Sequence, residues 1–213
     1  MGIVYFCIKK INLKMEDLTT EQKIAAAARK IFTQKGYAAT KTRDIAEEAG
    51  INLALVNYYF GSKENLFKQV LKEKFEALFG LMMPVLSDRD ISLDEKIRLL
   101  VKNYTKLLIE NEELPIFVLN ELRNNENIFN PILQQARTIS QPTIDEQLQH
   151  NGFAISTPDF IMNIVSLTIF PFIAKPLFIT SGMVKEEDFL QFIENREKLI
   201  PEWIFAILKQ SQQ

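Results

Sequence analysis

Residues 42–61 read TRDIAEEAGINLALVNYYFG, and the spacing of small and apolar residues in this stretch predicts two short helices joined by a tight turn. Ala46 offers the small side chain that two closely crossing helices require. Gly50, four residues later, supplies the positive φ that the turn needs. The residues expected to form the small core between the two helices are Ile45, Ala49, Ile51, Val56 and Tyr59. The stretch is therefore expected to fold as a helix-turn-helix.

Helices are also expected on both sides of this stretch. A helix beginning after Thr19 has apolar residues at helical spacing, and a long helix beginning after Ser62 is expected to end at Pro84, because proline cannot continue the hydrogen-bond ladder. The residues expected to cap the first four helices, in chain order, are Thr19, Thr40, Asn52 and Ser62. Gln22 stands where it completes a capping box with Thr19.

The remainder of the chain continues in the same helical pattern. Apolar residues recur every three or four positions, and no stretch alternates with period two. We therefore expect an all-α protein with an N-terminal extension (1–18), a helix-turn-helix domain (19–68) and a larger helical domain (69–213). The boundary between the two domains should fall inside the fourth helix.

Charge is distributed unevenly between these parts. Residues 1–72 contain 12 Lys/Arg and 7 Asp/Glu, whereas residues 73–213 contain 13 and 20, although the net charge of the whole chain is only −2. A basic first part joined to an acidic body is typical of a nucleic-acid-binding domain with a separate effector domain. Ordinary solvated charge on helix surfaces would give a similar count.

Composition excludes several classes of protein. One cysteine and one histidine rule out an internal disulfide and a His/Cys zinc site, and we expect a reducing compartment, no metal and no cofactor. The apolar run before Lys9 has the wrong order for a secretory signal, and Met15 is an alternative start. Residues 160–179 are apolar, but Lys175 and two prolines argue against a membrane span.

The order of motifs in residues 36–67, GYAATKTRDIAEEAGINLALVNYYFGSKENLF, resembles the DNA-binding region of the TetR/AcrR family of bacterial transcriptional regulators. The resemblance extends over about 19–71. It implies a cytoplasmic homodimer that binds an operator in double-stranded DNA and a small-molecule effector, as a repressor with a helical dimerisation and effector domain. Asn57 departs from the aromatic residue often found there, and Leu53 and Leu55 replace more polar residues.

In this interpretation the third helix enters the major groove with its amino end. Leucine and alanine side chains there suit thymine methyl groups, while tyrosine, threonine, arginine and lysine suit phosphates. The expected DNA contacts are Thr40, Thr42, Arg43, Asn52, Leu53, Ala54, Leu55, Asn57, Tyr58, Tyr59 and Lys63. The alternative for Tyr59 and Phe60 is that both simply fill the small core.

The larger domain is expected to hold the effector and the dimer interface. Aromatic and methionine side chains predicted to converge on an effector pocket are Tyr104, Phe117, Phe129, Met162 and Phe170, and Pro171 beside them should free a carbonyl group. An ordinary aromatic core is the alternative. The apolar residues expected at the dimer interface are Ile164, Leu167 and Phe170 on one helix, and Phe189, Phe192, Ile193, Leu199, Trp203 and Ile207 on the last.

Two other classes of protein are alternatives to a DNA-binding regulator. An enzyme is disfavoured because no glycine-rich phosphate loop, nucleophile elbow or metal-spaced cluster occurs. His150 precedes Asn151-Gly152, which indicates a solvated helix end and not a catalytic base. A helical adaptor that uses its helix-turn-helix only for packing is the second alternative, and failure to bind DNA at low salt would favour it.

Overall fold

A computed structural model describes residues 18–124 and 126–212. The described residues form helices and no β-strand, so the expected all-α class is confirmed. The chain divides into two compact units, Met1–Leu71 and Lys72–Gln213, and the division falls inside one helix. Apart from Leu18, the N-terminal extension lies outside the described residues.

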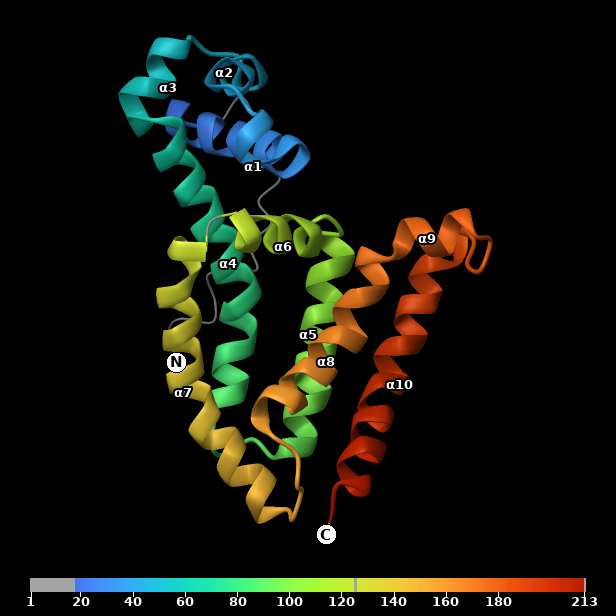
Figure 1. Cartoon of the computed structure of the whole chain (residues 1–213). Coiled ribbons are helices and arrows are strands. Elements are labelled where there is room, and N and C mark those ends of the chain that lie inside the picture. The colour runs from blue at the N-terminus through green and yellow to red at the C-terminus, as the bar shows by residue number, and fades with distance from the viewer. Residues whose placement is uncertain (1–17, 125, 213) are drawn as a thin grey trace. The chain divides into compact units, whose positions relative to one another are not determined.

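The first unit contains α1 (Thr20–Ala39), α2 (Thr42–Ala49), α3 (Leu53–Phe60) and the beginning of α4 (Lys63–Ser87) (Figure 1). The capping box expected at the start of α1 is present: the Thr19 hydroxyl accepts from Gln22 N, and the Gln22 side chain accepts from Thr19 N. One face of α1 is buried, and its side chains are Ile24, Ala25, Ala27, Ala28, Ile31 and Phe32. Helix α2 packs against α1.

The turn between α2 and α3 has the expected geometry. Gly50 adopts φ 66° and ψ 33°, a left-handed conformation that side chains other than glycine rarely adopt. A Cβ atom added there would meet nothing within 4 Å, so backbone conformation and not space requires glycine. Ala46 and Val56 are 3% and 2% exposed, as expected for the core. Tyr59 is 43% exposed, so its placement in that core was wrong.

The start of α2 differs from the prediction. Thr40 does not cap this helix, because its hydroxyl donates to the carbonyl of Gly36 at 2.7 Å and α2 begins one residue after Lys41. Asp44 takes over the capping role, since its carboxylate accepts from the backbone N–H of Lys41 at 3.1 Å. That hydrogen bond, together with the nearby Lys35 ammonium group, lowers the pKa of the Asp44 carboxyl.

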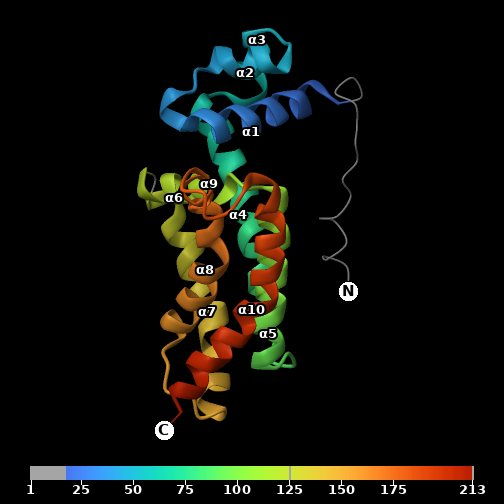
Figure 2. The same ribbon diagram turned by 90° about the vertical axis from the view of Figure 1, so that its right-hand side faces the viewer.

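The second unit comprises the rest of α4, α5 (Leu93–Glu110), α6 (Leu114–Asn124), α7 (Glu126–His150), α8 (Thr157–Ile173), α9 (Lys175–Thr180), the short 3₁₀ helix η3 (Glu186–Asp188) and α10 (Phe189–Gln210). Helices α5, α8 and α10 pack against one another, and α10 runs beside α5 in Figure 2. Helices α6 and α7 contact each other and α8. None of the helices in the described ranges is long and apolar enough to cross a membrane.

Helix α4 does not end at Pro84, contrary to the prediction. The helix continues to Ser87 with the proline inside it. Proline has no N–H for the carbonyl four residues earlier, which belongs to Gly80. Gly80 and Pro84 are both exposed, so water can serve that carbonyl. The connection to α5 is instead fixed by the buried Lys96, whose ammonium group donates to the carbonyls of Leu86 and Asp88.

Pro171 interrupts the hydrogen bonding of α8 as expected, and the freed carbonyl has a partner. Proline at 171 leaves Leu167 O without its helical donor. The guanidinium group of Arg196 on α10 donates to Leu167 O at 3.0 Å. The same guanidinium group lies 5.7 Å from the centroid of the Phe192 ring and 5.1 Å from that of Trp203. The carbonyl that we expected to find beside a ligand therefore joins α8 to α10.

Candidate nucleic-acid interface and effector cavity

Helix α3 buries one face and exposes the other. Its N-terminus is capped as predicted, because the Asn52 side-chain oxygen accepts from Ala54 N at 2.9 Å. Val56 is the buried residue of this helix, while Ala54 and Asn57 are exposed and Leu55 is 39% exposed. Leu53 and Phe60 are half-buried. The residues predicted to face bases thus lie mainly on the accessible side of α3.

The two tyrosines at the end of α3 are also accessible. Tyr58 is 80% exposed, and its ring meets that of Tyr59 edge to face at 5.3 Å between centroids. A tyrosine that the core does not need leaves its phenolic hydroxyl free to bond an external acceptor.

Cations without a carboxylate partner lie at the start of α2. Lys41 and Arg43 are exposed, and neither forms an ion pair within the described ranges of the chain. Lys30 and Lys35, by contrast, pair with Glu48 and Asp44 at 2.6 and 3.1 Å. Sequence reasoning did not select Lys41, although its position just before the first turn of α2 makes it a candidate for a phosphate contact.

The threonines beside these cations differ in accessibility. Thr42 is half-buried, whereas Thr40 is only 2% exposed and its hydroxyl is occupied by Gly36 O. The structure therefore does not present the Thr40 side chain to a ligand.

Lys63, at the start of α4, makes contacts inside the first unit. Its ammonium group donates to the carbonyls of Tyr37 and Thr40 at 3.0 and 2.9 Å, and it lies 4.1 Å from the centroid of the Tyr37 ring. Tyr37 in turn packs on Phe67 of α4 at 4.7 Å between ring centroids. A lysine has three N–H donors. Two of them hold the end of α1 against α4, which leaves one for an external group.

Four of the five residues predicted to line an effector pocket are described, and they differ in exposure. Tyr104 and Phe117 are buried, at 2% and 5% exposure, and burial raises the pKa of the Tyr104 phenol. Met162 and Phe170 are 64% and 54% exposed on α8. The side chain of Phe129 lies outside what the structure describes. Two of the five thus belong to the core and two to an accessible face of α8.

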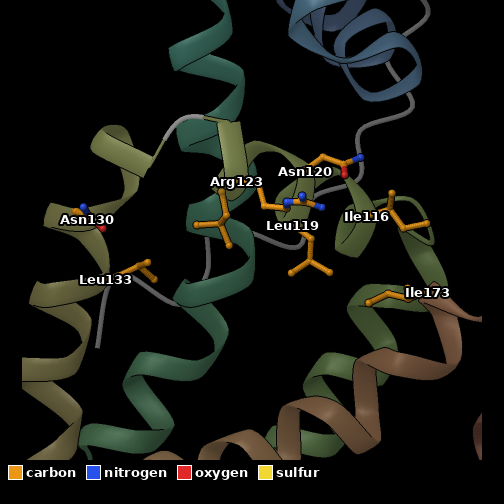
Figure 3. Close-up of a pocket in the computed structure, with 8 residues that line it drawn as sticks. Ile116, Leu119, Asn120, Arg123, Asn130, Leu133 and Ile173 are labelled. Carbon is orange, nitrogen blue, oxygen red and sulfur yellow. The ribbon is translucent and has the colours of Figure 1, made fainter.

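A cavity of about 800 Å³ lies instead between α6, α7 and α8 of the second unit. The residues that line it are Ile116, Leu119, Asn120, Leu122, Arg123, Asn130, Leu133 and Ile173. Figure 3 shows Leu119 from α6, Leu133 from α7 and Ile173 from α8 pointing toward the space between the three helices. Sequence reasoning did not select these residues, because residues on three separate helices give no contiguous signal.

Metal chemistry has no support in the described part of the molecule. No group of three or more His, Cys, Asp or Glu side chains lies close enough together there to hold a metal ion.

A capped, exposed helix after a tight turn, with unpaired cations on the preceding helix, defines a helix-turn-helix DNA-binding protein. The family model described as "Bacterial regulatory proteins, tetR family" matches residues 24–70. Residues 24–70 therefore resemble the DNA-binding region of the tetR family, as the sequence predicted, and the comparisons support a DNA-binding transcription regulator and not an enzyme.

Relatives of similar length support this assignment. The chain is 25% identical over 198 residues to the probable HTH-type transcriptional regulator YttP of Bacillus subtilis, covering 90% of this chain and 95% of that one. It is 25% identical over 177 residues to IcaR of Staphylococcus aureus, a negative transcriptional regulator of a biofilm operon, covering 81% and 92%. The solved structure of HlyIIR, a hemolysin II transcriptional regulator, matches with a TM-score of 0.63 at 24% identity, covering 89% and 97%.

Proposed function

We propose that the chain is a cytoplasmic, homodimeric repressor whose affinity for an operator changes when a small molecule binds in the second unit. The observation that carries the DNA-binding part is the exposed face of α3 beside unpaired Lys41 and Arg43. In this proposal Leu53, Ala54 and Leu55 contact thymine methyl groups, with Asn52 and Asn57 at the edge of the same face. The cytoplasmic location is proposed because a DNA-binding regulator must be in the compartment that contains its operator.

Phosphate contacts are proposed for the residues around α3. Tyr58 and Tyr59 have exposed rings, and Thr42, Arg43 and Lys41 stand at the start of α2, where backbone N–H groups and the helix dipole also favour an anion. Lys63 is proposed to contact a phosphate with its third N–H, already oriented by its two internal hydrogen bonds. Thr40 is not included, because its side chain is buried.

The dimer is proposed to form through α8 and α10. Met162 and Phe170 on α8, with Leu199 and Trp203 on α10, leave large apolar side chains exposed in the single chain. Such a surface is expected where two copies pack as a four-helix bundle. Ile164, Phe189 and Ile193 of the predicted interface are already buried in one chain, at 1%, 1% and 2% exposure, so they belong to its core.

Dimerisation also follows from what DNA reading requires. One eight-residue α3 contacts only a few base pairs, and two copies related by a two-fold axis reach two successive major grooves. The repressor role is supported by the similarity to IcaR, which is a negative transcriptional regulator.

The effector is proposed to bind the cavity between α6, α7 and α8. Its volume of about 800 Å³ lies within the usual range for small-molecule sites, roughly 300–1,000 Å³. Helix α4 begins in the first unit and ends in the second, so it offers a continuous element through which binding can shift the balance between two states.

A reporter assay tests the repressor role. DNA flanking the gene for this chain is placed upstream of a reporter, with and without expression of the chain. Repression predicts lower reporter output when the chain is expressed, with recovery for the double variant Tyr58→Ala/Arg43→Gln. Higher output on expression of the intact chain would contradict repression and indicate an activator.

A further inference from the structure

We propose that the cavity between α6, α7 and α8 binds an amphipathic anion, a molecule with one negatively charged head group on an apolar tail. The inference rests on the proposed effector function and adds the chemical class of the ligand. It is carried by the way that apolar side chains and one cation share the cavity wall.

The apolar part of the wall comes from all three helices. Ile116, Leu119 and Leu122 lie on α6, Leu133 on α7 and Ile173 on α8. Ile116 and Leu119 remain 42% and 48% exposed, which is a large apolar area for a cavity mouth to leave in water. Covering that area with a hydrocarbon chain is favourable by about 25 cal/mol for each Å² removed from water.

The charged part of the wall is a single side chain. Arg123 is the only charged residue among the described residues that line the cavity. It follows Leu119 by four positions and Ile116 by seven, so helical spacing places all three on one face of α6. Figure 3 shows the Arg123 guanidinium group near Leu119.

Arg123 is also without a partner among the residues that the structure describes, since no ion pair or hydrogen bond between them involves it. The neighbouring cation, Lys175 on α9, is different, because it pairs with Glu112 at 2.8 Å and with Glu186 at 3.1 Å. Glu121 on α6 is only 4% exposed and is not part of the cavity wall, since two residues along a helix separate it from Arg123 by more than half a turn. Arg123 is therefore the cation available to an incoming anion.

A guanidinium group binds carboxylate or phosphate oxygens through two parallel hydrogen bonds, which neutral or cationic head groups cannot form with it. The Asn130 side chain adds an amide donor to the same wall. The cavity thus offers a place for one anionic head and a larger place for an apolar tail.

Direct binding without DNA tests this inference by calorimetry on the full chain. The ligands are four ten-carbon probes that share one tail: decanoate, decyl phosphate, decanol and decylammonium. We expect both anions to bind at least tenfold more tightly than decanol, and decylammonium to bind no better than decanol. The tighter of the two anions identifies the head group. Acetate, which lacks the tail, should not bind.

Two matched variants assign the effect to Arg123. Arg123→Gln should remove the preference for the anions, about tenfold or more, and leave decanol affinity unchanged. Arg123→Lys should restore part of the preference for the anions. The control, Arg137→Gln, removes an exposed arginine of α7 that does not line this cavity and should change nothing. Equal affinities for decanoate, decyl phosphate and decanol, or an unchanged preference in Arg123→Gln, would overturn the inference.

The proposed regulation is measured separately, so that its failure is distinguishable. Decanoate affinity is determined with and without DNA flanking the gene. If the two sites are coupled, DNA and decanoate must affect each other equally. The factor by which DNA changes the affinity for decanoate must equal the factor by which decanoate changes the affinity for DNA. Arg123-dependent binding of decanoate with no effect of DNA would support the ligand class and contradict the regulatory role of the cavity.

Discussion

Two regions of this molecule keep large apolar side chains exposed, and their polar neighbours differ. In the first unit Leu55 and Tyr58 project from an eight-residue helix. At the start of the preceding helix, Lys41 and Arg43 form no ion pair with any other described residue. In the second unit Phe170 and Trp203 lie on long helices. Arg196, whose guanidinium group lies 5.1 Å from the centroid of the Trp203 ring, already donates to the carbonyl of Leu167.

The difference shows how charge decides what an exposed apolar surface can bind. A polyanion such as DNA needs free cations beside the apolar contacts, because phosphate neutralisation supplies much of the affinity. A second copy of the same chain does not require free cations, and a surface on which Arg196 already donates to Leu167 O suits a second copy better. The predictions below test that contrast, from the largest expected effect to the smallest.

The largest effect is expected from placing a carboxylate on the α8 and α10 surface. Trp203→Glu should weaken self-association at least about 100-fold, because the change removes a large apolar side chain from the interface and puts in its place a carboxylate whose desolvation costs several kcal/mol. Sedimentation at low micromolar concentration should show a dimer for the wild type and a monomer for the variant.

Leu190→Glu is the matched control for that experiment. Leu190 is 49% exposed on the same helix, but it is nine residues from Leu199, or about two and a half turns, and so faces the opposite side. The Leu190→Glu variant should therefore remain a dimer. A monomeric wild type would contradict the proposed interface.

The second prediction concerns the turn that orients α3. Gly50→Ala should lower the free energy of unfolding of the first unit by about 1–2 kcal/mol, because alanine is strained at φ 66°. Gly80→Ala is the control, since Gly80 lies inside α4 and an added Cβ would also meet nothing within 4 Å. It should be neutral or stabilise by up to about 1 kcal/mol. Hydrogen exchange of α1 amides reports the Gly50 effect, and equal effects of the two changes would refute the strain argument.

The third prediction tests the cations beside α3. Arg43→Gln should reduce the slope of log affinity against log salt by about 0.9, as expected for the loss of one phosphate contact, and weaken binding several-fold near 0.1 M salt. Lys30→Gln removes a cation that is already paired with Glu48 and should leave the slope nearly unchanged. Fluorescence anisotropy titrations at several salt concentrations measure both. The same slope for Arg43→Gln and the wild type would argue against a phosphate contact.

The smallest effect is a pH dependence at the start of α2. The pKa of Asp44 is lowered in the folded chain, so its charge stabilises the fold above the ordinary carboxyl pKa of about 3.9, and this contribution disappears as pH falls through the folded value. Asp44→Asn should therefore melt earlier than the wild type at pH 7, and the gap should close below about pH 4. A gap that stays constant down to pH 2.5 would assign the effect to packing instead of charge.

Sequence alone predicted the parts of the structure that local chemistry determines. The positive φ of Gly50, the caps at Thr19 and Asn52 and the burial of Val56 each depend on a few neighbouring residues. The family resemblance then supplied the function of the first unit, because its motif order is continuous in the chain.

Tertiary contacts decided what the sequence could not. Thr40 has a side chain typical of a helix cap, but its hydroxyl donates to Gly36 O at 2.7 Å. Pro84 is tolerated because solvent reaches the carbonyl that it frees. The cavity wall is assembled from α6, α7 and α8. Residue type alone could not show that Arg123 would have no partner among the described residues while Lys175 has two.

The central claim is that two copies of α3 read DNA, and a footprint of the full chain on DNA flanking its own gene tests it most directly. The account predicts protection of a sequence with two-fold symmetry, whose half-sites are separated by about one helical turn, roughly 34–36 Å, or a multiple of it. Tyr58→Ala should weaken that protection. No protection at low salt, where electrostatic binding is strongest, would contradict the claim and leave a helix-turn-helix used only for packing.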